Sequence, residues 1–146
     1  LQDRENTAGV RTPHWRGVTL LNELKSAGVP VAIASDNTRD PFYAYGDLDG
    51  FEVLREGARI LHFDHPQTDA FAWTRSVTAD PAAIARFAFS GALKAGVDAD
   101  LILFKGRSWT ELMSRAQADR TVIRAGKAID TTLPDYRELD DLMGPS

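Results

Sequence analysis

Apolar residues in the first part of the chain recur in the pattern of helices that surround one buried strand. They return at intervals of three and four over 17–27 and again over about 48–62, which predicts an amphipathic helix in each range. Asp80 followed by Pro81 has the pattern of an N-cap with proline at the first helical position, so a third helix is predicted to run through Phe87.

Between the first two predicted helices, residues 29–34 read VPVAIA, a short and almost wholly apolar run. Such a run is typical of a parallel strand that helices cover on both faces, and Pro30 is compatible only with its start. The long polar and aromatic loop 35–49 then lies at the carboxyl end of the predicted strand. In parallel α/β folds functional residues gather at that end, so this loop is the candidate site.

The later part of the chain has the pattern of short strands. An apolar burst predicts a strand over 100–104, and the ranges 120–124 and 127–130 flank Ala-Gly as the arms of a hairpin. The sequence therefore predicts two regions, an α/β region over 1–90 and a β-rich region over 91–146.

Two further helices are predicted in the β-rich region. Ser108 and Glu111 match the capping-box pattern that begins a helix. A last helix is predicted over 134–143, with Tyr136, Leu139 and Leu142 facing inward.

Composition narrows the class of protein. The chain has 146 residues, 43% of them hydrophobic and 26% charged, as in ordinary soluble domains. Its formal charge of -4 and lack of any Lys/Arg run argue against nucleic acid and membrane partners. The absence of cysteine excludes disulfides and thiolate metal sites, and no apolar run approaches the roughly 18–20 residues that span a bilayer. We expect a cytoplasmic protein that acts on a small neutral molecule.

The first residues of the chain have the composition of a loop that connects two elements. Residues 1–15 are polar and rich in turn formers, and no initiator methionine is present. We expect that the chain starts within a larger protein, just after a strand.

Asp36 is the main candidate for chemistry, because it ends the predicted buried strand. A carboxylate there stays ionised only if a metal, a cation or several donors compensate its desolvation. The alternative is that Asp36 or Asn37 merely caps the turn after the strand, and spacing alone favours this turn.

The stretch AGVPVAIASDNTRDPFYAYGD, with LQDR and the segment 16–19, resembles the eighth strand and following loop of cytosine deaminases in the metal-dependent amidohydrolase superfamily. GALKAGVDADLILF resembles the exit from that superfamily's barrel into its small β-sandwich, and VIRAGKAI resembles the closing hairpin. The resemblance covers the last third of the family's length. It implies an α/β fold, the C-terminal end of a (β/α)8 TIM barrel (last strand and helices) followed by part of a β-sandwich.

The resemblance also implies a reaction. In the family one divalent metal, zinc or iron, is held by a His-x-His pair, another His and a final-strand Asp, whose place Asp36 takes. Metal-bound hydroxide would attack the amine-bearing carbon of cytosine or a similar free heterocycle, and Asp36 would accept the proton of the water. The His ligands have no counterpart in the chain, so we expect this chain alone to be inactive.

Two further residues bear on the substrate. Asn37 stands where many cytosine deaminases have a second Asp that helps hold the substrate, and an amide brings no charge. Rings such as an alkylamino triazine, creatinine or isocytosine are therefore alternatives. Phe42 takes the place where the family often puts an aromatic wall over the ring, although a loop aromatic can equally pack on a barrel rim.

The expected partners are the heterocyclic amine and the remainder of the barrel, in the same parent chain or a companion chain. An isolated barrel strand has unpaired edges, and a homo-oligomer is expected. The alternative of another class is a non-catalytic module, in which the β-rich half serves as an oligomer interface.

Two other kinds of metal chemistry are less suited to the sequence. Nucleic-acid deamination through the H-x-E…P-C-x-x-C signature is excluded by the lack of cysteine. His62 and His65 have a spacing that could reach a metal, but an interaction with a helix C-terminus, or solvation, is favoured.

Overall fold

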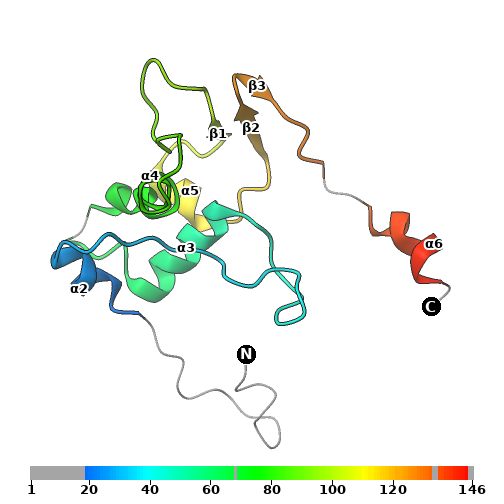
Figure 1. The fold of residues 1–146 in the computed structure, drawn as a ribbon, viewed down its shortest axis with the longest axis horizontal. Helices are drawn as coiled ribbons and strands as arrows, with labels where there is room; N and C mark the ends of the chain where they lie inside the picture. The colour runs from blue at the N-terminus through cyan, green and yellow to red at the C-terminus, as the bar shows by residue number, and fades with distance from the viewer. Residues whose placement is uncertain (1–18, 68, 133–134, 145–146) are drawn as a thin grey trace, which may run out of the picture. The chain divides into compact units, whose positions relative to one another are not determined.

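The computed structural model describes residues 19–67, 69–132 and 135–144 (Figure 1). The chain divides into two compact units, one up to Ala92 and one from Leu93. The described part of the first unit contains helices, and that of the second contains a small antiparallel sheet with short helices. The fold is thus a small α/β piece, and the assignment of its parts to a barrel and a sandwich stays a prediction.

The first unit is built on helices. In order along the chain they are α2 Leu21–Ser26, α3 Gly50–Leu61, the 3-10 helix η1 Ala70–Val77 and α4 Ala79–Ile84. The predicted amphipathic helix over about 48–62 is confirmed as α3, which begins where the Asp49 carboxylate accepts a hydrogen bond of 2.9 Å from the Phe51 N–H. Residues 17 and 18 of the first predicted helix lie outside the described residues.

The core of the first unit lies where α3 and η1 pack together. The rings of Phe63 and Trp73 are stacked with centroids 3.8 Å apart, and both side chains are buried. The Lys25 ammonium lies 4.0 Å from the centre of the Trp73 ring, a cation–π contact. A Cβ at Gly57 of α3 would lie 2.7 Å from Phe63 and 2.9 Å from Ile33, so glycine lets the helix approach both side chains.

The predicted buried strand over 29–34 is wrong as a strand in this structure. The segment pairs with no other strand among the described residues; the Ile33 N–H donates to the carbonyl of Ser76 at 3.1 Å. Val31 and Ile33 are half-buried, while Val29 is exposed. The physical reason is that a β-strand needs a hydrogen-bonded neighbour, and the described residues provide none here.

The third predicted helix begins earlier and ends earlier than expected. Thr78 precedes α4, and Asp80, the expected N-cap, lies in the first turn and pairs with Arg75 at 2.9 Å. Helix α4 ends at Ile84, before Phe87. The sequence pattern missed η1 entirely, although the Asp69 carboxylate begins it by accepting a hydrogen bond of 3.0 Å from the Phe71 N–H.

The second unit contains a three-stranded antiparallel sheet in the order β1-β2-β3. The strands are β1 Leu101–Phe104, β2 Arg120–Arg124 and β3 Lys127–Ala128, which confirms the strand and hairpin predicted from the pattern. Ala125 and Gly126 form the turn with φ of 46° and 76°, the backbone of a two-residue hairpin. The Asp100 carboxylate holds this turn by accepting a hydrogen bond of 2.7 Å from the Ala125 N–H.

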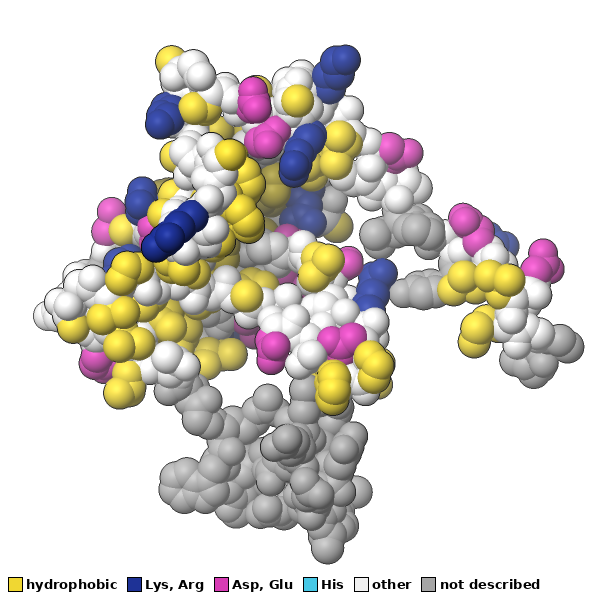
Figure 2. Space-filling view, in the orientation of Figure 1, with side chains coloured by type: hydrophobic (Ala, Val, Ile, Leu, Met, Phe, Trp, Pro, Cys, Tyr) yellow, Lys and Arg dark blue, Asp and Glu magenta, His cyan; other side chains and the backbone are white. Residues whose placement is uncertain are grey.

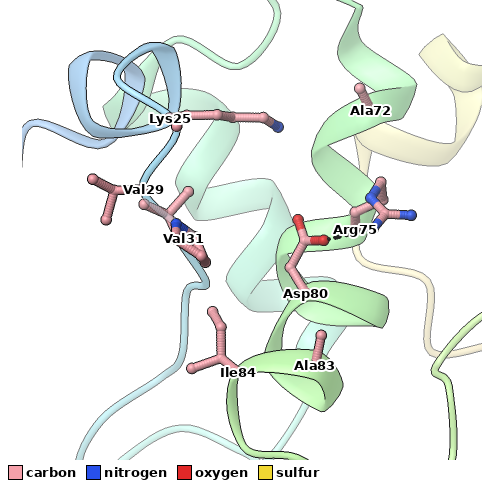
Figure 3. A pocket seen from close by; sticks show the side chains of 10 residues that line it. Lys25, Val29, Val31, Ala72, Arg75, Asp80, Ala83 and Ile84 are labelled. Carbon is pink, nitrogen blue, oxygen red and sulfur yellow. Dashed lines mark ion pairs between the residues drawn. The ribbon is translucent and has the colours of Figure 1, made fainter.

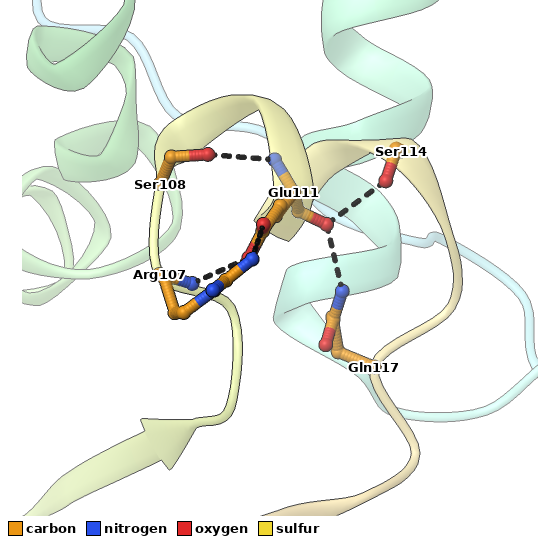
Figure 4. A network of polar contacts seen from close by, with 5 residues as sticks. All are labelled: Arg107, Ser108, Glu111, Ser114 and Gln117. Atoms are coloured by element: carbon orange, nitrogen blue, oxygen red, sulfur yellow. Dashed lines mark hydrogen bonds and ion pairs between the residues drawn. The ribbon is translucent and has the colours of Figure 1, made fainter.

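Helix α5, Trp109–Ser114, begins at the predicted serine, whose hydroxyl accepts a hydrogen bond of 3.2 Å from the Glu111 N–H (Figure 4). The Glu111 carboxylate reaches past Ser108 to the N–H of Arg107 at 2.9 Å, so only half of the expected capping box forms. The Arg107 guanidinium, 2.7 Å from the other carboxylate oxygen, holds the pKa of Glu111 below its ordinary value.

The last predicted helix is divided in two, η2 Tyr136–Leu139 and α6 Asp140–Met143. The prediction that Leu139 and Leu142 face inward is wrong, because their side chains are 46% and 82% exposed. The side chain of Tyr136 lies outside the described residues. In the described residues these two short helices contact each other, which gives their apolar side chains little to pack against. No helix in the described ranges is both long and apolar enough to cross a membrane.

Candidate active-site loop

Asp36 lies directly after the extended segment 29–34, with an exposed side chain and a φ of 59°. This left-handed conformation costs a residue other than glycine roughly 1–2 kcal/mol, although Asp adopts it more readily than most. No hydrogen bond or ion pair joins the Asp36 carboxylate to any residue in the described ranges. The carboxylate therefore faces solvent from a strained backbone position.

The carboxylate that organises the turn is Asp40. One of its oxygens accepts hydrogen bonds of 2.9 Å from the backbone N–H groups of Phe42 and Tyr43. The other accepts a hydrogen bond of 2.8 Å from the side-chain amide of Asn37. The Asn37 amide, with these backbone donors, lowers the pKa of Asp40 from its ordinary value. Sequence reasoning considered only Asp36 and Asn37 for the turn, although Asp40-Pro41 is a turn signal in its own right.

Arg39 closes the loop on itself. Its backbone N–H donates to the carbonyl of Tyr45 at 3.3 Å, and its Nε donates to the carbonyl of Gly46 at 3.1 Å. Its guanidinium pairs with Asp47 at 3.3 Å. These three interactions bring residues 45–47 next to the residues that follow Asp36.

Aromatic side chains occupy the exposed part of the loop. The Phe42 side chain is 64% exposed and that of Tyr45 is 68% exposed. Tyr43 and Tyr45 contact edge to face, with ring centroids 5.6 Å apart and an interplanar angle of 82°. Asp36, Asn37 and Phe42 thus belong to one folded loop, but no hydrogen bond or ion pair joins Asp36 to either of the other two side chains among the described residues.

A pocket of about 460 Å³ lies at the opposite end of the segment 29–34, next to its first residues (Figure 3). Its lining is mostly apolar, and Arg75 and Asp80 form an ion pair of 2.9 Å across it. Asp36, Asn37 and Phe42 do not line it. Figure 2 shows hydrophobic side chains at the surface over the part of the first unit that contains α2 and α4.

The described residues do not complete a metal site. In the ranges 19–67, 69–132 and 135–144 no group of three or more His, Asp or Glu side chains could hold an ion. His62 ends α3 in the left-handed conformation, and His65 Nδ1 accepts a hydrogen bond of 3.1 Å from the Gln67 N–H. An exposed carboxylate such as Asp36 suits a divalent ion as one ligand of several.

Comparison with known proteins gives the family. A pterin deaminase of Rhizobium rhizogenes (strain K84) is 59% identical to this chain over 144 residues, which are 99% of the chain and 32% of that protein's length. No solved structure matches the chain. The expected superfamily is confirmed, while cytosine as the substrate is not. The model of the Amidohydrolase family matches residues 6–131, and the chain therefore belongs to the amidohydrolase family of hydrolases.

Proposed function

We propose that the protein containing this chain removes the ring amine of a pterin as ammonia, with water as the other reactant. The identity of 59% to a pterin deaminase, over almost the whole chain, carries this proposal. In the reaction water adds to the ring carbon that bears the amine, and the C–N bond breaks as the amine takes up a proton. The chain spans 32% of that relative's length, so the active protein is proposed to include further residues.

The choice of ring follows from its chemistry. Pterin contains a pyrimidine ring with an amine at the carbon between the two nitrogens and an oxo group beside them, the arrangement that isocytosine shares. Cytosine carries its amine and oxo group in exchanged places. Among the rings considered from the sequence, isocytosine therefore presents the same reacting carbon as pterin, whereas cytosine presents a different one.

Asp36 is proposed to supply one oxygen ligand to a divalent metal, zinc or iron, and to take the proton of the attacking water. A bound divalent ion would lower the pKa of that water. Two observations favour Asp36 for this role: its carboxylate is exposed, and Asp40 rather than Asp36 binds the backbone N–H groups of the loop. A carboxylate that formed the turn could not also hold an ion without loosening the loop.

Asn37 and Phe42 are proposed to serve the substrate in different ways. The Asn37 amide nitrogen is held by Asp40 at 2.8 Å, which leaves its carbonyl oxygen as the atom that can accept a hydrogen bond from a ring N–H. The exposed face of Phe42 offers a surface on which the heterocycle can lie.

The test is made in the complete protein, with Asp36→Asn and, as a control, Asp64→Asn, another exposed acid outside the loop. We expect Asp36→Asn to lower pterin deamination by at least about a hundredfold and to reduce the bound metal, because the amide supplies neither charge nor a base. The control should retain both. Unchanged metal content and rate in Asp36→Asn would instead favour a module in which Asp36 has no chemical role.

A substrate panel tests the ring. Ammonia release is measured from pterin, isocytosine and cytosine at equal concentrations. We expect pterin to be turned over with the highest kcat/KM. A protein that deaminates cytosine and leaves pterin intact would contradict the proposal and return the substrate to the cytosine class.

A further inference from the structure

We propose that Tyr45 is a binding residue for the second ring of the substrate and makes the site selective for a two-ring heterocycle. This inference rests on the proposed function, because it concerns the same site. It follows from the way the loop holds Tyr45 and from the exposure of its ring.

The loop folds back on itself, so that the backbone of Tyr45 lies next to the residues that follow Asp36. Arg39 is the third residue after Asp36, and its N–H donates to the Tyr45 carbonyl at 3.3 Å. The Arg39 side chain also contacts Gly46 at 3.1 Å and Asp47 at 3.3 Å. Tyr45 and the two residues after it are therefore attached to the segment that presents the candidate catalytic carboxylate.

The two tyrosines of this loop have different surroundings. Tyr43 is 39% exposed, and its ring edge lies 3.9 Å from where a Cβ of Gly46 would stand, so it packs against the loop backbone. Tyr45 is 68% exposed and touches Tyr43 edge to face at 5.6 Å between centroids. In this arrangement Tyr43 supports the ring of Tyr45 from one side and leaves a face of Tyr45 to the solvent.

An exposed, supported ring is suited to stacking. Any flat heterocycle can stack on an aromatic side chain, and the strength of the stacking depends on the area of the two faces in contact. Pterin has two fused rings, whereas isocytosine has only the reacting one. If Phe42 lies on the reacting ring, Tyr45 gives the loop a second aromatic surface for the other ring.

The experiment compares Tyr45→Ala and Tyr45→Phe with the unaltered complete protein, on pterin and on isocytosine. We expect Tyr45→Ala to raise KM for pterin about tenfold with little change in kcat, since stacking acts on binding. Its kcat/KM for isocytosine should stay within about twofold of the unaltered value. Tyr45→Phe keeps the flat face and should behave as the unaltered protein on both substrates. Ile60→Ala, at an exposed apolar residue of α3 outside the loop, is the control and should change neither constant.

The outcomes are distinguishable. Equal losses on both substrates in Tyr45→Ala, or a loss that Tyr45→Phe shares, would overturn the inference and assign the ring to packing. An unaltered protein without pterin turnover would overturn the proposed function and the inference with it. If the unaltered protein accepts pterin but not isocytosine, the second ring is required, and Tyr45→Ala against Tyr45→Phe on pterin decides whether Tyr45 binds it.

Discussion

Gly91 lies where the backbone leaves no room for a side chain. Its φ is 61°, and a Cβ there would lie 2.5 Å from the carbonyl oxygen of Thr78 and 2.7 Å from its carbon. Both neighbours are backbone atoms at the beginning of α4 and cannot rotate away. At Gly91 the backbone near the end of the first unit therefore lies directly against the backbone at the beginning of α4.

Gly91→Ala is therefore expected to lower the free energy of unfolding by more than about 2 kcal/mol, from strain and collision together. Gly96→Ala is the matched control, because Gly96 also has a positive φ of 85° but no atom lies within 4 Å of its would-be Cβ. Thermal unfolding of the two variants measures the difference. Equal losses of Tm would contradict the close contact and leave only the strain of the backbone.

At this scale the sequence predicts a functional loop over 35–49, and this stays a prediction, but it could not tell which of the loop's acids forms the turn. Asp36 and Asp40 are both followed by residues typical of turns, and only the folded backbone decides which carboxylate meets the N–H groups. The same holds for Arg39, whose partner Asp47 is determined by the closure of the loop rather than by proximity in sequence.

At the scale of the elements, the loop over 35–49 is expected to lose stability in acid. The pKa of Asp40 is lowered, chiefly by the Asn37 amide and further by the N–H groups of Tyr43 and Phe42. A folded-state pKa below the unfolded one contributes stability that is present above the unfolded pKa and is lost as pH falls through the folded value. The loop should therefore loosen below about pH 4.

Asp40→Asn is expected to weaken the loop at pH 7 and to show a smaller further loss on acidification than the unaltered protein. Proteolysis of the loop at pH 7 and at pH 3, with an acid-stable protease, measures this. Asp119→Asn removes an exposed carboxylate that pairs with Lys105 in the second unit and is the control. An acid response of the loop that is the same in Asp40→Asn and in the unaltered protein would assign it to other groups.

Element prediction succeeded where the local pattern is sufficient. The apolar period gave α3 to within two residues at either end, and the hairpin was found from its Ala-Gly turn. Helix η1 was missed because its eight residues, AFAWTRSV, are too few for a clear helical pattern and a 3-10 helix has a different period from an α-helix. The segment 29–34 was read as a strand from its composition, yet pairing depends on a neighbour that the described residues do not contain.

At the scale of the whole molecule, we expect further residues of the complete protein to join at the segment 29–34, which pairs with no strand among the described residues. Backbone N–H groups of Val31, Ala32 and Ala34 donate to no backbone carbonyl in the part of the chain that the structure describes. Apolar surface and a pocket lie beside the segment. Val31 and Ala32 are half-buried, and backbone groups without partners are costly where water is excluded, so a complete protein is expected to pair them.

In a complete protein we expect these three amides to exchange hydrogen slowly, at rates near those of β1 and β2. In the 146-residue chain alone they should exchange much faster than the sheet amides of the second unit. Hydrogen exchange followed by mass spectrometry compares the two samples. Rapid exchange of these amides in both would mean that the segment is not a strand of a larger sheet.

The burial of Trp73 has an optical consequence. Its indole is 3% exposed, stacked on Phe63 and covered by the Lys25 ammonium, surroundings that shift fluorescence emission to shorter wavelengths than in water. Trp109 in the second unit is half-buried and begins a surface helix, so its emission should lie further to the red. The chain has three tryptophans, so in a Trp15→Phe variant the two that remain give each unit its own reporter. Melting curves of that variant, recorded at the two wavelengths, would reveal whether the units lose their structure together or in turn.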